Sequence, residues 1–118
     1  MRNRPAALEY SVRAEALAAE YGHPLYLAIA LRAQGVAESL RGAHEQAEGL
    51  LRRSLDQFTA LGTRWQAGRT WSELGHLEAG RGRLKEAGDC FRQALALFEA
   101  MGARPDADKT LQAIQALR

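Results

Sequence analysis

The sequence repeats itself at a spacing of about 40 residues, and this repeat restricts the folds open to the chain more than any other feature. When the sequence is shifted by this spacing, glycines, aromatic residues and small residues keep one register. The aligned pairs are Gly35 and Gly75, Glu38 and Glu78, Arg41 and Arg81, Gly42 and Gly82, Ala47 and Ala87, Arg52 and Arg92, Leu55 and Leu95, Phe58 and Phe98, Ala60 and Ala100, Gly62 and Gly102, and Arg64 and Arg104. A repeat of this length is typical of solenoid arrays.

Each repeat unit carries the pattern of two helices. In the second half of each unit, apolar and small residues recur at three-and-four spacing, which places them on one face of a helix. These residues are Ala47, Leu50, Leu51, Ser54, Leu55, Phe58 and Leu61 in the first unit, and Ala87, Cys90, Phe91, Ala94, Leu95, Phe98 and Met101 in the second. We therefore expect one face of each of these helices to be buried.

Glycine and proline mark the ends of the expected helices. Glycine suits the left-handed conformation in which many helices end, and proline loses no hydrogen bond in the first turn. The glycines that stand at expected helix ends are Gly42, Gly62, Gly82 and Gly102. The prolines that precede helical patterns are Pro5, Pro24 and Pro105.

The register extends outward from these two units. Ala7, Ala14, Tyr21 and Gly22 fall on Ala47, Ser54, Leu61 and Gly62, and Thr110, Leu111 and Ile114 fall on Thr70, Trp71 and Leu74. The sequence thus predicts an all-α chain of six antiparallel helices, near residues 5–21, 24–40, 43–61, 64–79, 84–101 and 105–117. The 118 residues form one repeat domain: a half unit (5–22), two units (24–62 and 64–102) and a second half unit (105–118).

Composition and charge narrow the class of protein. The content of 47 % hydrophobic and 25 % charged residues is that of an ordinary soluble globular protein. The net charge of +2 lacks the positive excess that binding to nucleic acid requires. No apolar run approaches the roughly 18 residues of a membrane helix, and the single cysteine, Cys90, excludes an internal disulfide. We expect a cytoplasmic protein that binds neither nucleic acid nor membrane.

The second unit resembles the tetratricopeptide repeat (TPR). The residues that match this signature are Trp71, Leu74, Gly75, Ala87, Phe91 and Ala94, and the first unit matches it at Leu31, Gly35, Ala47 and Leu51. The resemblance implies a right-handed α-solenoid of helical hairpins. In such a hairpin Gly75 and Ala87 permit close approach of the paired helices, while Trp71 and Phe91 fill the space between them.

Both units depart from the TPR pattern at two places. Glu38 and Glu78 replace an aromatic residue, and Thr59 and Glu99 stand where a helix-ending proline is usual. The unit is consequently longer than the usual length of roughly 34 residues. Such lengthened units look like those in the helical arms of large bacterial transcriptional activators and signalling ATPases.

In the TPR family the first helix of each unit lines a concave groove. The resemblance places on its wall Ile29, Arg32, Val36, Ser39, Arg69, Ser72, His76, Lys109 and Gln112. Arg32, Arg69 and Lys109 would favour an acidic peptide segment or a chain-terminal carboxylate through charge-assisted hydrogen bonds, although they are equally well explained as solvated charges. Family members that clamp a carboxylate use asparagines in the groove, and Val36 and His76 are not asparagines.

No pattern in the sequence indicates catalysis, a metal or a cofactor. The three histidines are scattered, and Cys90 falls on a buried stripe. The segment 80–83 lacks the third glycine of a phosphate-binding loop and follows a helix, so we expect an interhelix turn. Trp65 stands at a helix start, where helix-junction packing or a partner contact explains it.

The sequence therefore predicts a non-catalytic protein–protein interaction module, or adaptor, whose concave face or open helical ends bind another polypeptide. One alternative is a homodimer through the terminal helices, because Leu111, Ile114 and Leu117 form an apolar stripe on the last helix. Another is the effector-sensing arm of a transcriptional regulator, which would hold a small anion near Arg32, Arg69 and His76.

Overall fold

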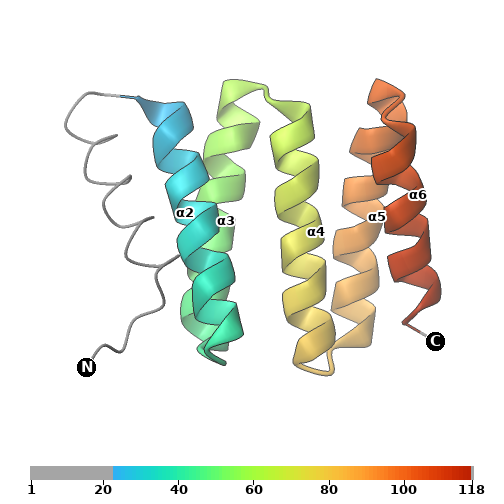
Figure 1. Ribbon diagram of the computed structural model, residues 1–118, viewed down its shortest axis with the longest axis horizontal. Coiled ribbons are helices and arrows are strands. Elements are labelled where there is room, and N and C mark those ends of the chain that lie inside the picture. The colour runs from blue at the N-terminus through green and yellow to red at the C-terminus, as the bar shows by residue number, and fades with distance from the viewer. Residues whose placement is uncertain (1–22, 118) are drawn as a thin grey trace. The chain divides into compact units, whose positions relative to one another are not determined.

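The computed structural model describes residues 23–117, and these residues form helices joined by short turns, with no strand among them (Figure 1). The helices are α2 (Pro24–Leu40), α3 (His44–Leu61), α4 (Arg64–Gly80), α5 (Leu84–Met101) and α6 (Arg104–Gln115). The expectation of an all-helical chain is confirmed for this range. The first expected helix, near 5–21, and the half unit 5–22 lie outside the described residues.

The described residues fall into two compact units, and the division comes where one repeat unit was expected to give way to the next. Unit 1 extends to Leu61 and contains the hairpin of α2 and α3, while unit 2 begins at Gly62 and contains α4, α5 and α6. Within unit 2, α5 packs against α4 and also against α6. Each unit is a compact body of its own.

The turns that follow α2 and α4 have the same backbone geometry. Gly82 adopts a left-handed conformation with φ +78°, and the N–H of Arg83 donates a 2.9 Å hydrogen bond back to the carbonyl of Glu78. Gly42 has φ +82° at the equivalent position. This pairing satisfies helix-end carbonyls that would otherwise lack partners, so segment 80–83 is an interhelix turn as expected.

Proline begins two of the helices, as the sequence predicted. Pro24 is the first residue of α2, and Pro105 is the second residue of α6. Pro5 lies outside the described residues. The first turn of a helix tolerates proline because its N–H groups have no intrahelical acceptor.

The core of unit 1 lies between α2 and α3. Leu31 from α2 and Leu51 and Phe58 from α3 are fully buried. Ser54 is also fully buried, and its hydroxyl donates a 2.7 Å hydrogen bond to the carbonyl of Ala28. That bond ties α3 to the backbone of α2 and satisfies a polar group inside the core.

The core of unit 2 depends on two glycines of α4 that admit the aromatic rings of α5. A Cβ atom at Gly75 would lie 2.6 Å from the ring of Phe91, and one at Gly68 would lie 2.7 Å from the ring of Phe98. Real Cβ atoms do not approach that closely, so both sites need glycine. The two phenylalanines are thereby buried against α4.

The residues that match the TPR signature lie mostly in these cores. Those that are buried are Leu31, Gly35, Ala47, Leu51, Leu74, Gly75, Ala87, Phe91 and Ala94. Trp71 is half-buried and packs against a cluster that includes Phe98 and Ala107. The α5 face expected to be buried also includes Cys90, which is 5 % exposed.

Candidate functional site

A groove of about 460 Å³ runs through unit 2 between α4 and α6, and α5 forms its floor. Its lining residues come from all three helices: Arg69, Ser72, Glu73, His76, Phe91, Phe98, Asp106, Lys109, Thr110, Gln112 and Ala113. The volume lies within the range of protein ligand sites, which is roughly 300 to 1,000 Å³. It suffices for a few side chains of a bound segment.

Helical spacing explains why these residues gather. On α4 the lining residues follow one another at three-and-four spacing from Arg69 to His76, and on α6 they do so from Asp106 to Ala113. Residues with this spacing share one face of a helix. The groove thus has two polar walls, one for each helix.

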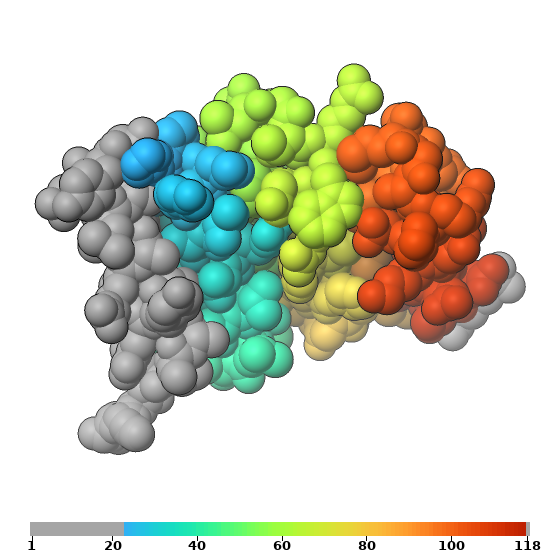
Figure 2. All heavy atoms as spheres, turned by 45° about the horizontal axis from the view of Figure 1, so that its top comes forward, coloured from blue at the N-terminus to red at the C-terminus, as the bar shows by residue number. Residues whose placement is uncertain are grey.

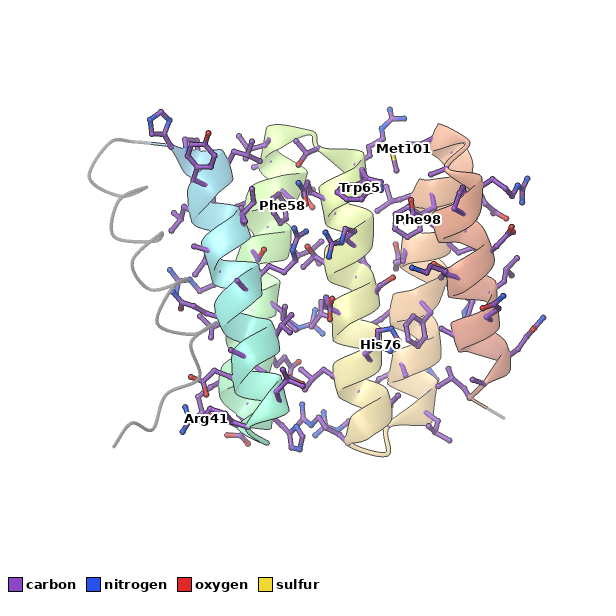
Figure 3. All side chains as sticks on the ribbon, viewed as in Figure 1. Arg41, Phe58, Trp65, His76, Phe98 and Met101 are labelled. Carbon is purple, nitrogen blue, oxygen red and sulfur yellow. The ribbon has the colours of Figure 1, made fainter. Side chains whose placement is uncertain are left out.

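The floor of the groove is aromatic. Phe91 and Phe98 are each 2 % exposed, and their spacing of two turns places both on the same face of α5. The His76 ring meets Phe91 edge to face, with ring centroids 5.0 Å apart and an interplanar angle of 75°. This contact fixes the imidazole at the edge of the floor, where Figure 3 shows it on the α5 side of α4.

A tryptophan contacts two of the groove-lining residues, Arg69 and Asp106. The indole N–H of Trp65 donates a 3.0 Å hydrogen bond to a carboxylate oxygen of Asp106, joining the first turns of α4 and α6. The Arg69 guanidinium lies 5.2 Å from the centroid of the Trp65 ring, within the range of a cation–π contact. In Figure 2 the α4 atoms (yellow-green) stand beside the α6 atoms (orange-red) along this rim.

The groove carries charges of both signs. Arg69 and Lys109 occupy equivalent positions on the two walls, and within the described part of the chain neither has an ion-pair partner. Glu73, one turn after Arg69, likewise has no ion-pair partner within residues 23–117. Asp106 differs, because its carboxylate already accepts the Trp65 hydrogen bond. Two cations and the Glu73 carboxylate are therefore available to a bound molecule, and Asp106 retains one oxygen outside the Trp65 bond.

The structure brings five of the expected groove residues together: Arg69, Ser72, His76, Lys109 and Gln112. Arg32 and Ser39 belong to α2 in unit 1, and they are not among the lining residues of this groove. Arg32 is only 8 % exposed, and its guanidinium lies 4.9 Å from the centroid of the Phe58 ring. A weakly hydrated guanidinium can be buried in this way, so Arg32 is not the solvated wall cation that the sequence suggested.

Sequence reasoning missed Glu73 and Asp106 on the groove walls and the floor role of Phe98. One signal was available for Asp106. Trp65 and Asp106 stand about one repeat apart, so they belong to neighbouring first helices, and a tryptophan N–H that packs between helices usually finds an acceptor. Glu73 falls on the same helical face as Arg69 and could have been included by spacing alone.

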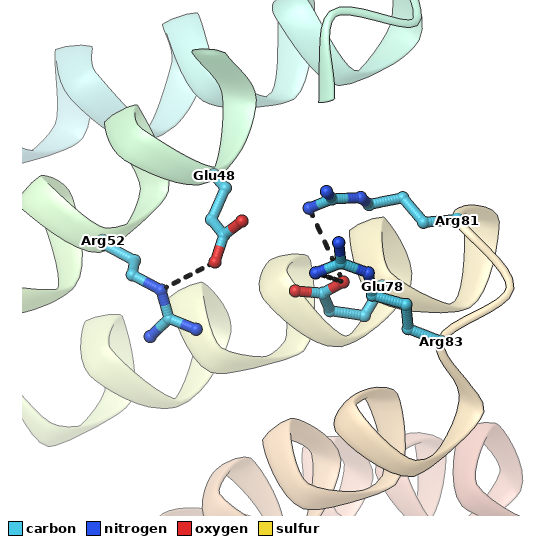
Figure 4. Close-up of polar contacts among 5 residues, drawn as sticks. All are labelled: Glu48, Arg52, Glu78, Arg81 and Arg83. Atoms are coloured by element: carbon cyan, nitrogen blue, oxygen red, sulfur yellow. Dashed lines mark hydrogen bonds and ion pairs between the residues drawn. The ribbon is translucent and has the colours of Figure 1, made fainter. Parts of the chain in front are cut away.

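A second polar cluster lies at the end of α4. Glu78, which stands where TPR proteins have an aromatic residue, is 2 % exposed. One of its carboxylate oxygens lies 3.7 Å from guanidinium nitrogens of both Arg81 and Arg83 (Figure 4). In unit 1 the equivalent Glu38 pairs with Arg41 at 3.0 Å. Both glutamates therefore hold arginines of the turn that follows their helix.

Two kinds of feature are absent from the described residues. No group of three or more His, Cys, Asp or Glu residues within this part of the chain is arranged to hold a metal ion. None of the helices from α2 to α6 combines the length and the apolar character that crossing a membrane requires.

Comparison with known proteins finds a likeness in structure and none in sequence. No protein-family model matches the chain, and no curated protein matches it in sequence. Among solved structures it is similar to BtubC (BKLC) from P. vanneervenii, with a TM-score of 0.67 and 17 % sequence identity. The match covers 94 % of this chain but 55 % of that one, so the chain spans about half the length of BtubC. The likeness is one of fold alone.

Proposed function

We propose that this chain is a non-catalytic protein–protein interaction module of the TPR type, which binds a polypeptide segment in the groove of unit 2. The observation that carries the proposal is the convergence of Arg69, Lys109 and the neighbouring polar residues on one groove over an aromatic floor. An apolar floor with a few polar groups on its walls is the usual composition of a binding site.

The arrangement of the polar groups supports a binding role over a catalytic one. A serine nucleophile needs a base within hydrogen-bond reach, and Ser72 and His76 are the candidates because they are one turn apart on α4. They form no hydrogen bond with each other or with any other described residue. The His76 ring packs on Phe91 instead.

The architecture that we propose is a right-handed α-solenoid of six antiparallel helices. It is supported by the repeat in the sequence, by the repeated turn geometry at Gly42 and Gly82, and by the close approach of ring and glycine that Gly75 permits. In such arrays each unit contacts only its neighbours, and the walls of successive units form the binding surface.

A second candidate function is self-association through α6. Leu111 is 37 % exposed, and Ile114 and Leu117 are half-buried, so part of the expected apolar stripe is available to a second copy of the chain. An uncovered apolar face on a repeat helix favours such pairing. Light scattering that shows a monomer at high concentration contradicts this candidate.

A tagged pull-down from the native cell extract tests the leading proposal. Three proteins are compared: the wild type, the groove variant Arg69→Glu, Lys109→Glu, and the control Arg53→Glu, Lys85→Glu, whose exposed positions lie outside the groove. The control undergoes the same change in net charge. We expect one polypeptide to be captured by the wild type and the control and to be lost from the groove variant. Equal recovery by all three proteins contradicts the proposal.

A small-molecule effector predicts a different result. In that case the capture of polypeptides does not depend on the groove residues. Anionic metabolites raise the melting temperature of the wild type but not that of the groove variant. Thermal melts across a metabolite panel separate the two functions.

A further inference from the structure

We infer that the groove of unit 2 selects an extended peptide segment that carries an acidic side chain and a basic side chain two residues apart. This inference rests on the proposed function and adds the chemistry of the partner. It comes from the placement of three unpaired charges, Arg69, Lys109 and Glu73, along one groove.

The first step concerns the two cations. Arg69 on α4 and Lys109 on α6 hold equivalent positions in the repeat, so they flank the groove at the same level from opposite walls. Like charges that face each other across a groove are relieved by an anion between them. A carboxylate placed there accepts hydrogen bonds from both walls, and charge-assisted bonds of this type are about twice as strong as neutral ones.

The second step concerns the carboxylate of Glu73. It lies four residues after Arg69 on the same face of α4, and at a rise of roughly 1.5 Å per residue the two levels are about 6 Å apart along the helix. A basic side chain of the partner placed at this second level pairs with Glu73. A partner with acidic groups alone would place an anion against Glu73, which costs affinity.

The third step fixes the spacing within the partner. An extended chain advances roughly 3.3 Å per residue, so the residues at positions i and i+2 lie about 6.6 Å apart and point to the same side. That separation matches the two charge levels of the groove. Ser72, His76 and Gln112 supply hydrogen-bonding groups along the walls, and these suit the backbone of an extended segment.

The Asp106 carboxylate does not reverse this pattern. It lies one turn before Lys109, on the other side of the cation pair from Glu73, and one of its oxygens accepts the hydrogen bond from Trp65. The charges along the groove therefore run from Asp106 to the cation pair and then to Glu73, and Glu73 is the carboxylate with both oxygens open to a partner. This difference between the two ends makes the groove directional for a segment of mixed charge.

The test is a selection from a phage-displayed library of short random linear peptides on the immobilised full chain. A parallel selection uses the exchanged variant Arg69→Glu, Glu73→Lys, Lys109→Glu, in which the signs of these three charges are reversed and Asp106 is kept. We expect the wild type to enrich sequences with one acidic and one basic residue separated by one position. The exchanged variant should enrich the opposite order of the two charges.

The outcomes separate this inference from the function on which it rests. If enriched peptides bind the wild type, are lost from the Arg69→Glu, Lys109→Glu variant and show no charge pair, the groove binds peptides and the inference is wrong. If the order of charges is the same for wild type and exchanged variant, the inference is also wrong. If no peptide is enriched on the wild type over the Arg69→Glu, Lys109→Glu variant, both proposals fail.

A milder double variant guards against misfolding of the exchanged protein. Titration of the enriched peptide against Arg69→Gln, Lys109→Gln should show a loss of affinity of about tenfold or more, because two charge-assisted contacts are removed. Exchange of the two charged residues within the peptide should weaken its binding to the wild type to a similar extent. An unchanged affinity in either experiment contradicts the inference.

Discussion

The indole nitrogen of Trp65 and a carboxylate oxygen of Asp106 lie 3.0 Å apart, and this hydrogen bond joins the first turns of two helices that have no direct connection in the chain. α6 otherwise packs on α5, so the bond fixes α6 to α4 across the end of the groove. Loss of this hydrogen bond should therefore change the shape of the groove as well as the stability of the fold.

Trp65→Phe keeps the aromatic ring but removes the donor. We expect the free energy of unfolding to fall by about 1 kcal/mol, because a hydrogen bond to a charged group on a partly exposed side chain is lost. Asp106→Asn should cost less, since its amide oxygen can still accept. Urea unfolding followed by circular dichroism measures both changes, and equal stability of Trp65→Phe and wild type would show that the bond does not form in solution.

Gly75→Ala should lower the free energy of unfolding by about 1 to 3 kcal/mol, because the new methyl group overlaps the ring of Phe91. Gly49 in α3 is the matched control, as a Cβ there meets nothing within 4 Å. Gly49→Ala should instead raise it by about 0.5 to 1 kcal/mol through helix propensity. The opposite signs are checked by urea unfolding, and a stabilising Gly75→Ala would contradict the close approach of α4 and α5.

Glu78→Gln should lower the free energy of unfolding by about 1 to 2 kcal/mol, because it leaves the cations of Arg81 and Arg83 without their nearly buried carboxylate. The equivalent Glu38 has a more exposed side chain (14 %), and Glu38→Gln should cost about 0.5 kcal/mol or less. Thermal and urea unfolding of the two variants test the difference. A larger loss for Glu38→Gln would contradict the account of this cluster.

Asp89 gives the chain a small dependence of stability on pH. Hydrogen bonds from Arg92 and then from Lys85 hold the pKa of the Asp89 carboxyl below its ordinary value. Since the folded pKa lies below the unfolded one, the stabilisation is present above the unfolded pKa and is lost as the pH falls through the folded pKa. Asp89→Asn should lower the melting temperature slightly at neutral pH, and this difference should vanish in strong acid. A difference that grows as the pH falls would have the wrong sign.

The helices of the described residues could be predicted because local signals coincide at their ends. α5 begins and ends at the expected residues, since Gly82 before it and Gly102 after it both adopt left-handed conformations that only glycine takes readily. The wall positions Arg69 and Lys109 followed from the same repeat, because equivalent residues of successive units face the same way.

Interactions between side chains of different helices were harder to predict. The burial of Arg32 over Phe58 and of Glu78 beside two arginines depends on how long side chains fold back onto their own unit. Comparison of one repeat with the next does not reveal this. The contact of Gly68 with Phe98 was missed for a similar reason, since it requires the distance between helix axes.

Site-specific photo-crosslinking tests the central claim, that the groove of unit 2 binds a polypeptide, most directly. A photoreactive phenylalanine analogue replaces Ser72 on the groove wall or, as a control, the exposed Gln93 of α5, which is not among the groove-lining residues. The account predicts that irradiation in the native cell extract joins one polypeptide to the Ser72 position, that the Gln93 position yields none of it, and that Arg69→Glu, Lys109→Glu abolishes the adduct. Adducts of equal yield at the two positions, or none at Ser72, would contradict it.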